Sequence, residues 1–330
     1  MAVPMIPPAA APDFLMRAGW GDADILPLAG DASFRRYFRV VAPGRQAVLM
    51  DAPPPHEDPR PFVQVAEYLT GIGLRAPAIL ARDLDAGLLL IEDFGDRRMR
   101  EAVDADPGSE VSIYRGVVDV LIELHRHNAA DLPRHGLDHW LGELALFTDW
   151  YCPEMGLTID DAEFRQAWRE VLEPVDTAPG AWVTELRDYH AENIMLTDGA
   201  GVARYGLLDF QDARVGHPAY DLVSMLEDAR RDVSPDVEAA MLAHYMNATE
   251  RGADFETAYW ALGAQRNTRI LGVFVRLWKR DGKPHYRSFQ ARMWGLLERD
   301  LTHPALAPVR AWFDANIPAE ARAAAWEEFA

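Results

Sequence analysis

Short apolar segments separated by turn-forming residues dominate the first ninety residues of the chain. Their length and two-residue alternation are typical of strands, and Pro43-Gly44 marks a turn between two of them. Between the third and fourth segments, apolar residues recur at helical spacing and predict one helix over residues 62–71. The pattern predicts strands over residues 25–28, 34–40, 46–50, 79–82 and 88–91.

The pattern becomes helical after residues 92–95. Residues 111–124 carry one apolar stripe, and residues 270–278 carry another that stops before a segment of basic residues, Gly and Pro. We therefore predict an α+β fold with two lobes. The N-terminal lobe, residues 1–95, is a small antiparallel β-rich unit with one helix, and the C-terminal lobe, residues 96–330, is larger and mainly helical.

Composition narrows the class of partner. With 330 residues, 49% apolar and 26% charged, the chain is an ordinary globular protein, and its formal charge of −19 disfavours a nucleic-acid partner. The single cysteine, Cys152, excludes an internal disulfide and fits a reducing compartment. No export signal and no apolar run of membrane-spanning length is evident, so we expect a cytoplasmic protein without membrane contact whose partners are small molecules.

Three polar side chains stand at spacings that suit phosphoryl transfer. Asp188 is followed five residues later by Asn193, and Asp209 begins a second polar element after a short apolar segment. Asp188 would orient or deprotonate an attacking hydroxyl, while Asn193 and Asp209 would hold Mg²⁺. Each residue alone is as easily a turn former with a satisfied side chain. The linked set favours a kinase.

These residues resemble the aminoglycoside phosphotransferase superfamily of small-molecule kinases. The similarity lies in Asp188-Tyr189-His190-Ala191-Glu192-Asn193, in Asp209-Phe210-Gln211-Asp212-Ala213, and in the segment 216–222. The resemblance covers nearly the whole chain from about residue 28. It implies the two-lobed protein-kinase-like fold, ATP as cofactor and Mg²⁺ as the metal.

Two N-terminal segments, 30–39 and 48–54, are similar to the branch of this superfamily that phosphorylates the anomeric hydroxyl of N-acetylmuramate and N-acetylglucosamine in bacterial cell-wall recycling. That resemblance implies ATP and an amino sugar as substrates and a sugar 1-phosphate as product. A different acceptor, such as an aminoglycoside or a choline-like amino alcohol, stays open. The oligomeric state, the acceptor hydroxyl and the anomer also stay open.

The chain departs from the family pattern in two places. Leu186 stands where the family's loop usually begins with His, and Met50 stands about where a strand lysine would hold the phosphates. The only lysines are Lys279 and Lys283, far downstream. Either the protein is a nucleotide-binding pseudokinase with a regulatory role, or an arginine replaces the lysine. We favour Arg35 or Arg39, because a guanidinium makes paired hydrogen bonds to phosphate.

Further nucleotide contacts are expected in the N-terminal lobe. Glu67 lies where the family's paired glutamate would be and is predicted to contact Arg35 or Arg39; a surface Glu with no partner is the alternative. The hydroxyl of Ser33 follows a glycine and would reach phosphate oxygens. The hinge residues Glu92, Asp93 and Phe94 would meet adenine through backbone groups.

Substrate contacts are the least determined by sequence. His190 either touches the acceptor or orients the loop as a satisfied core histidine. Arg187 and Arg214 are candidates for a sugar carboxylate, with a surface ion pair as the alternative for each. Trp150 is a candidate for stacking on a sugar face, with a place in the core as the alternative. Asp221 is expected to brace the catalytic loop through backbone hydrogen bonds.

Overall fold

The computed structural model describes residues 5–30, 34–178, 180 and 182–322. The chain forms two compact units. The first comprises Met1–Val120 and Glu192–Ala213, and the second comprises Leu121–Ala191 and Arg214–Ala330. We predicted a boundary between lobes after residue 95. That position lies inside the first unit, and the division into lobes at residue 95 stays a prediction.

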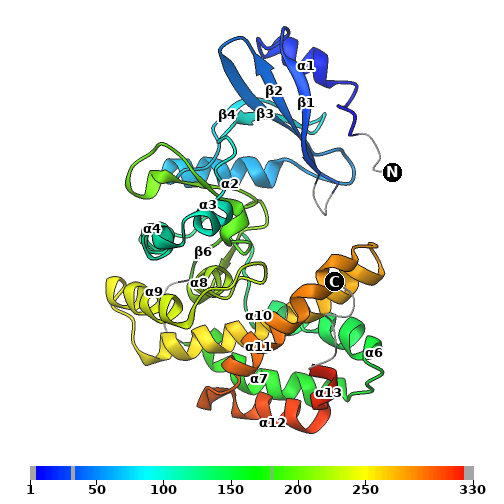
Figure 1. Ribbon diagram of the computed structural model, residues 1–330, viewed down its shortest axis with the longest axis vertical. Coiled ribbons are helices and arrows are strands. Elements are labelled where there is room, and N and C mark those ends of the chain that lie inside the picture. Colours follow the sequence, from blue (N-terminus) through cyan, green and yellow to red (C-terminus); the bar gives the residue numbers. More distant parts are fainter. Residues whose placement is uncertain (1–4, 31–33, 179, 181, 323–330) are drawn as a thin grey trace. The chain divides into compact units, whose positions relative to one another are not determined.

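The first unit is built on one antiparallel sheet with the strand order β1-β2-β3-β5-β4 (Figure 1). Its strands lie close to the predicted segments, and Gly44, with φ 75°, provides the left-handed residue of the β2–β3 turn. All five predicted strands are therefore confirmed. The strands are β1 (Asp24–Gly30), β2 (Arg36–Ala42), β3 (Arg45–Asp51), β4 (Ile79–Asp83) and β5 (Leu88–Glu92).

The predicted helix is present as α2 (Arg60–Gly71), but a second helix, α1 (Ala11–Arg17), lies beside the sheet (Figure 1). The expectation of one helix in this lobe was therefore incomplete. Proline is tolerated in the first turn of a helix, where its missing N–H has no partner to lose, so the Pro-rich start does not prevent α1. Phe14 and Leu15 of α1 pack into the core on one sheet face with Phe38 and Leu49.

A two-stranded sheet in the first unit lies between Asn193 and Asp209 in the sequence. Strand β7 (Ile194–Leu196) pairs antiparallel with β8 (Tyr205–Leu207). The other helices of this part of the chain are α3 (Met99–Ala105), η1 (Pro107–Ser109) and η4 (Gly201–Arg204). The chain passes between the units three times: within α4 (Glu110–Leu124), within η3 (Ala191–Asn193), and between Ala213 and Arg214.

The second unit is mainly helical and is organised around the long helix α10 (Ala253–Lys279), which contains the predicted segment 270–278. Helix α10 contacts η2, α8 and α11, and Gly272 lies so close to Leu146 that a side chain there would clash with its backbone. One short sheet pairs β6 (Val183–Glu185) with β9 (Arg214–Gly216). The helices before α10 are α5 (Leu137–Glu143), the π-helical η2 (Phe147–Tyr151), α6 (Cys152–Glu154), α7 (Asp161–Thr177), α8 (Ala219–Leu226) and α9 (Pro235–Ala248). Those after it are η5 (Pro284–Phe289), α11 (Gln290–Asp300), η6 (Pro304–Leu306), α12 (Ala307–Asn316) and α13 (Ala319–Arg322).

Within the described ranges, none of the helices combines the length and the apolar character that crossing a membrane requires.

Candidate active site

The loop that carries Asp188 leaves strand β6 and is fixed by hydrogen bonds to one buried carboxylate. Asp221, in the first turn of α8, accepts the backbone N–H of Leu186 at 2.6 Å and that of Arg187 at 2.8 Å. Arg187 adopts a left-handed backbone conformation with φ 67°, which costs a non-glycine residue about 1–2 kcal/mol. The predicted backbone hydrogen bonds of Asp221 are therefore present, and they hold a strained turn immediately before Asp188.

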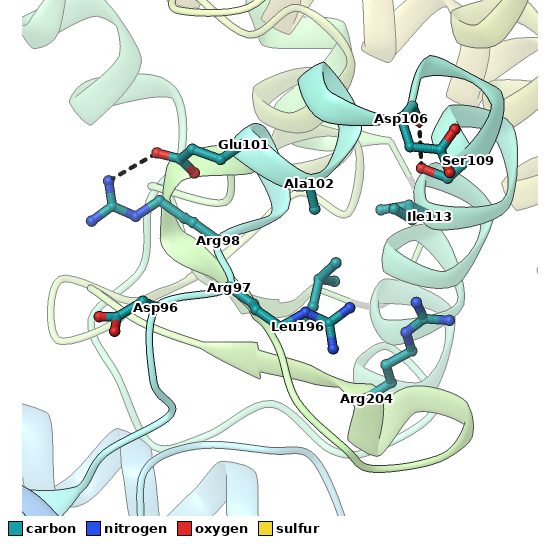
Figure 2. A pocket seen from close by; sticks show the side chains of 10 residues that line it. All are labelled: Asp96, Arg97, Arg98, Glu101, Ala102, Asp106, Ser109, Ile113, Leu196 and Arg204. Carbon is teal, nitrogen blue, oxygen red and sulfur yellow. Dashed lines mark hydrogen bonds and ion pairs between the residues drawn. The ribbon is translucent and has the colours of Figure 1, made fainter.

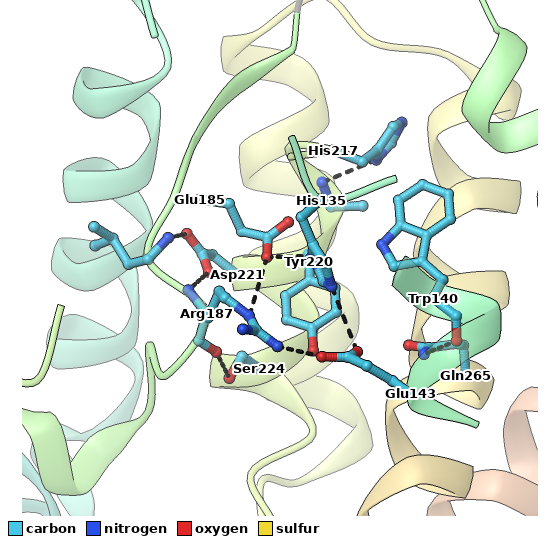
Figure 3. Close-up of polar contacts among 12 residues, drawn as sticks. His135, Trp140, Glu143, Glu185, Arg187, His217, Tyr220, Asp221, Ser224 and Gln265 are labelled. Carbon is cyan, nitrogen blue, oxygen red and sulfur yellow. Dashed lines mark hydrogen bonds and ion pairs between the residues drawn. The ribbon is translucent and has the colours of Figure 1, made fainter. Parts of the chain in front are cut away.

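The side chain of Arg187 points into a buried ionic network (Figure 3). It pairs with Glu143 at the end of α5 and lies 4.0 Å from Glu185. His135 links the two carboxylates, with Nδ1 2.7 Å from Glu185 and Nε2 3.4 Å from Glu143. Arg269 of α10 approaches Glu143 to 3.6 Å. Arg187 is thus fixed both by a hydrogen bond from its backbone N–H and by the ion pairs of its guanidinium.

The charges of this network depend on one another. Burial disfavours the charged form of His135, but the carboxylates of Glu185 and Glu143 outweigh it and raise the pKa of His135. Burial acts against an ionised Glu143, yet Arg269, His135 and Arg187 prevail and hold the pKa of Glu143 well below its usual range. Burial raises the pKa of Glu185 despite the opposing effect of His135 and Arg187. Loss of any one charge would therefore leave a buried partner uncompensated.

Two arginines of α10 lie within electrostatic range of Asp188. Arg266 and Arg269 are both electrostatically coupled to the Asp188 carboxylate. Arg266 is held in turn by Ser224, whose Oγ accepts its guanidinium at 3.0 Å and donates to the Arg187 carbonyl at 3.1 Å. Both arginines are therefore linked to the loop that presents Asp188, Arg266 through Ser224 and Arg269 through Glu143.

Asn193 and Asp209 are brought together by the β7–β8 hairpin. Ile194 pairs with Leu207, and the N–H of Leu208 donates to the Asn193 carbonyl at 2.9 Å, so Asn193 lies opposite the residue that precedes Asp209. The side chain of Asp209 accepts a hydrogen bond from Gln211 at 2.9 Å. Asp209 also has a left-handed backbone, φ 58°. Two residues with oxygen-bearing side chains thus lie at the same end of one hairpin.

Helix α2 anchors the segment that carries Asp209. Phe62 of α2 stacks on Phe210 with ring centroids 4.9 Å apart, and both rings are buried. Since Phe210 directly follows Asp209, this contact fixes where the aspartate lies relative to the five-stranded sheet.

Arg35 reaches the same carboxylate. It immediately precedes β2, is 9% exposed, and its guanidinium lies 3.5 Å from Asp209. Burial disfavours the charge, but Tyr37, Asp209 and Glu57 outweigh burial and raise the pKa of Arg35. A guanidinium therefore stands beside one of the two predicted metal ligands.

Arg39 is directed elsewhere. Its guanidinium is 2.6 Å from Asp93 and 2.8 Å from Asp96, and the buried Asp93 also accepts the N–H of Gly95 at 2.8 Å. The strand arginine thus fixes the segment that follows β5, the predicted hinge. Of the two arginines that we considered for the missing lysine, only Arg35 contacts Asp209.

The other hinge residues are organised around Arg75. Glu92 pairs with the Arg75 guanidinium, which also lies 5.1 Å from the centre of the Phe94 ring. A side chain at Gly206 of β8 would come within 2.6 Å of that ring. The side chains of Glu92 and Asp93 are both held in ion pairs. The groups that the hinge can offer to an adenine ring are therefore those of its backbone.

The prediction that Glu67 contacts Arg35 or Arg39 is wrong. Glu67 forms an exposed ion pair with Arg82 of β4 at 2.9 Å. The helix position was right, but the side chain lies toward the outer strand of the sheet. Met50 is fully buried on β3, between Tyr37 of β2 and Leu89 of β5, and is part of the core rather than of a polar site.

The remaining candidates are distributed as follows. His190 is buried 3.3 Å from the Arg230 guanidinium, and burial together with Arg230 holds the pKa of His190 well below its usual value, so the ring is neutral. Trp150 is half-buried in η2, and Arg214 is half-buried on β9. Ser33 lies outside the described residues.

A magnesium ion fits the donors that the hairpin offers. Carboxylate and amide oxygens are hard ligands, and Mg²⁺ usually takes one or two of them together with phosphate and water. Among the described residues no group of three His, Cys, Asp or Glu side chains is placed to hold a metal. Asn193 and Asp209 therefore suit a metal that arrives with a phosphate ligand better than a metal held by the protein alone.

Sequence reasoning missed Glu143, His135 and Arg269. Nothing in their local sequence marks them, because they come from three separate segments. Glu185 did carry a signal, since it is a charged residue closely flanked by the apolar Val183 and Leu186, and it lies in a strand whose three residues are all buried.

The site belongs to a known class. Residues 24–255 match the model of the phosphotransferase enzyme family, and the chain belongs to that family and is a phosphotransferase. Its sheet-based N-lobe and helical C-lobe form the protein-kinase-like fold. A choline/ethanolamine kinase family protein from Mesorhizobium loti has a TM-score of 0.63 at 17% identity, covering 91% of this chain and 98% of that one. The ADP-bound aminoglycoside phosphotransferase APH(2'')-Ib has a TM-score of 0.61 at 14% identity, covering 93% and 99%.

Two relatives are more similar in sequence. The N-acetylmuramate/N-acetylglucosamine kinase of Caulobacter vibrioides is 37% identical, over 95% of this chain and 98% of its own. The protein of the same name from Pseudomonas aeruginosa is 36% identical over 87% of each chain. The family resemblance inferred from the motifs is therefore confirmed.

Proposed function

We propose that the protein is a Mg²⁺- and ATP-dependent kinase that phosphorylates the anomeric hydroxyl of an amino sugar, N-acetylmuramate or N-acetylglucosamine, and yields the sugar 1-phosphate. The observation that carries the proposal is the pair of fixed elements described above: a braced loop that presents Asp188, and a hairpin that joins Asn193 to Asp209. The similarity of more than a third of positions to two sugar kinases supports the choice of acceptor. Because the reaction consumes ATP, we expect it to take place in the cytoplasm. We further expect the protein to act in cell-wall recycling.

Each motif residue then has a role in an in-line transfer. Asp188 would accept a hydrogen bond from the anomeric hydroxyl and direct its oxygen at the terminal phosphorus of ATP. The hydroxyl proton leaves toward Asp188 as the new P–O bond forms and ADP departs. Asn193 and Asp209 would hold Mg²⁺, which when bound neutralises phosphate charge.

Arg35 is the best candidate to replace the missing lysine. Its position beside Asp209 supports contact with the same phosphates that share the metal, whereas Arg39 is committed to Asp93 and Asp96. Ser33, and backbone groups of Glu92, Asp93 and Phe94, remain proposed nucleotide contacts. Glu67 is paired with Arg82, which argues against a pair of Glu67 with Arg35 or Arg39 that would hold the phosphates.

The acceptor side is proposed to include Trp150 and Arg214. The side chain of Arg187 is paired with Glu143, so it is better suited to hold the loop than to bind a sugar carboxylate. His190, buried and neutral beside Arg230, is likewise better suited to orient the loop. Asp221 is proposed to act through its backbone hydrogen bonds alone.

The direct test is turnover with a defined acceptor. Wild-type protein is incubated with Mg²⁺, ATP and either sugar, and the phosphorus spectrum of the product shows whether phosphate is attached at the anomeric carbon and in which configuration. We expect Asp188→Asn to lower kcat by about 100-fold or more. The matched control is Asp198→Asn, an exposed aspartate after β7, which should behave as wild type.

The alternatives give different results in the same assay. Turnover on an aminoglycoside or on choline but on neither sugar would reassign the acceptor. Binding of an ATP analogue without turnover on any of these hydroxyls would identify a pseudokinase and overturn the proposal.

A further inference from the structure

A cavity of about 430 Å³ lies in the first unit, beside the segment that follows β5 (Figure 2). It is lined by residues after the hinge, by α3, by the start of α4 and by the β7–β8 hairpin. None of its lining residues belongs to the metal or nucleotide set proposed above. Its volume is in the range of small-molecule sites.

Two arginines meet at this cavity because of strand pairing. The carbonyl of Arg97 accepts the N–H of Leu196 at 2.7 Å, and the carbonyl of Arg204 accepts the N–H of Thr197 at 2.8 Å. Leu196 and Thr197 are consecutive, so the two arginines flank the end of β7. Figure 2 shows both guanidinium groups on the same side of the cavity near Leu196, with Asp106 and Ser109 across from them.

The charges around the cavity are unequally paired. Arg98 forms an ion pair with Glu101 at 3.5 Å, and Asp96 with Arg39 at 2.8 Å. Neither Arg97 nor Arg204 has an ion pair or side-chain hydrogen bond to any residue that the structure describes. In a chain with 52 acidic and 33 basic residues, two neighbouring guanidinium groups without a carboxylate partner are unexpected.

The rest of the lining is suited to a sugar. Ala102, Ile113 and Leu196 form an apolar wall that a ring can cover with its C–H face. Ser109 donates its hydroxyl proton to the Asp106 carbonyl at 2.7 Å, which leaves the serine oxygen and the Asp106 carboxylate as acceptors for sugar hydroxyls. The same acidic residue disfavours a polyanion such as a nucleic acid.

We infer that this cavity is a second ligand site, separate from the proposed transfer site, that binds a phosphorylated monosaccharide. Arg97 and Arg204 grip the dianionic phosphate with paired charge-assisted hydrogen bonds, and the sugar ring lies over the apolar wall toward Asp106. The bound ligand joins the segment after the hinge to the hairpin that carries Asn193 and Asp209.

Calorimetric titration with glucose 1-phosphate, inorganic phosphate and glucose tests the site. Wild type is expected to bind glucose 1-phosphate more tightly than inorganic phosphate, to show no binding of glucose, and to lose affinity as salt rises, because the arginines are exposed. Arg97→Gln/Arg204→Gln should weaken binding at least about tenfold. The control Arg169→Gln removes an exposed arginine of α7 and should leave the affinity unchanged.

A second variant tests the cavity without removing charge. Ala102→Phe fills the apolar wall and should also weaken binding, while its melting curve and that of the double variant should show a folded protein. Unchanged affinity in both variants, or no binding of any phosphate ester by wild type, overturns the inference. The Arg97→Gln/Arg204→Gln variant should keep the kinase turnover of wild type in the absence of glucose 1-phosphate, so that failure of the proposed kinase reaction and failure of this site are told apart.

Discussion

Replacement of Asp221 by Asn tests whether the catalytic loop is held by one carboxylate. Both oxygens of Asp221 accept a backbone N–H, from Leu186 at 2.6 Å and from Arg187 at 2.8 Å, and the side chain is 1% exposed. Asparagine keeps one acceptor and turns an NH₂ group toward the other donor. One buried N–H then has no partner, which costs about 1–3 kcal/mol.

The backbone of Arg187 adds to this effect. Its left-handed conformation persists only while the surrounding contacts impose it, so the loop is expected to relax when one of the two hydrogen bonds is lost. Displacement of a catalytic group by about 1 Å is enough to lower kcat by about 100-fold. The Michaelis constant for ATP should change little, since Asn193, Asp209 and Arg35 lie outside this contact.

Two measurements decide the outcome. Chemical denaturation gives the free energy of unfolding, expected to fall by about 1–3 kcal/mol, and steady-state kinetics separate kcat from the Michaelis constants. Asp198→Asn provides the control for removal of an aspartate charge at an exposed position. Wild-type stability together with wild-type kcat in Asp221→Asn would refute the bracing role. A lower stability with unchanged kcat would mean that Asp221 contributes to the stability of the fold but not to the catalytic step.

Three further predictions follow from single contacts. Arg35→Gln should raise the Michaelis constant for ATP and lower kcat, each by about tenfold, because a charge-assisted contact to phosphate is lost; steady-state kinetics at varied ATP check this. Gly206→Ala should destabilise the protein by about 1–3 kcal/mol and weaken nucleotide binding, because its Cβ would displace the Phe94 ring; denaturation and nucleotide titration check this. Burial raises the pKa of Glu227 to about 7, and Glu238 contributes. The folded state therefore holds this proton more tightly than the unfolded chain does, and stability from Glu227 is lost as pH rises from about 4.5 to about 7. Glu227→Gln should flatten that decline in denaturation curves.

Each of these predictions has an opposing result. Unchanged ATP kinetics in Arg35→Gln would leave another residue to replace the lysine. A Gly206→Ala protein with wild-type stability would show that the Phe94 ring moves freely. For Glu227→Gln, a pH dependence equal to that of wild type and of Glu256→Gln, an exposed control on α10, would remove Glu227 as its source.

The sequence by itself determined the five strands and helix α2 of the first unit, and it pointed to the motif residues. The strands around Phe38 and Leu49 were predictable because alternation of apolar residues follows directly from the geometry of a strand with one buried face. Asp188, Asn193 and Asp209 could be proposed from the sequence because the chemistry expected of them depends on residue type and short spacing along one loop and one hairpin. Arg35 could be proposed as one of two candidates, because the N-terminal lobe has no lysine and a guanidinium can bind phosphate.

Only the tertiary structure decided which side chains pair. Arg39 and Asp93 are 54 residues apart and Arg187 and Glu143 are 44 apart, so no local pattern links them. Glu67 was assigned to the right helix but to the wrong arginine, because the direction of a side chain on a helix depends on what packs around it. Helix α1 was missed because its stability comes from the sheet face that Phe14 and Leu15 cover, not from its own sequence. Local periodicity fixes elements, whereas ion pairs and buried networks depend on distances that exist only once those elements have packed.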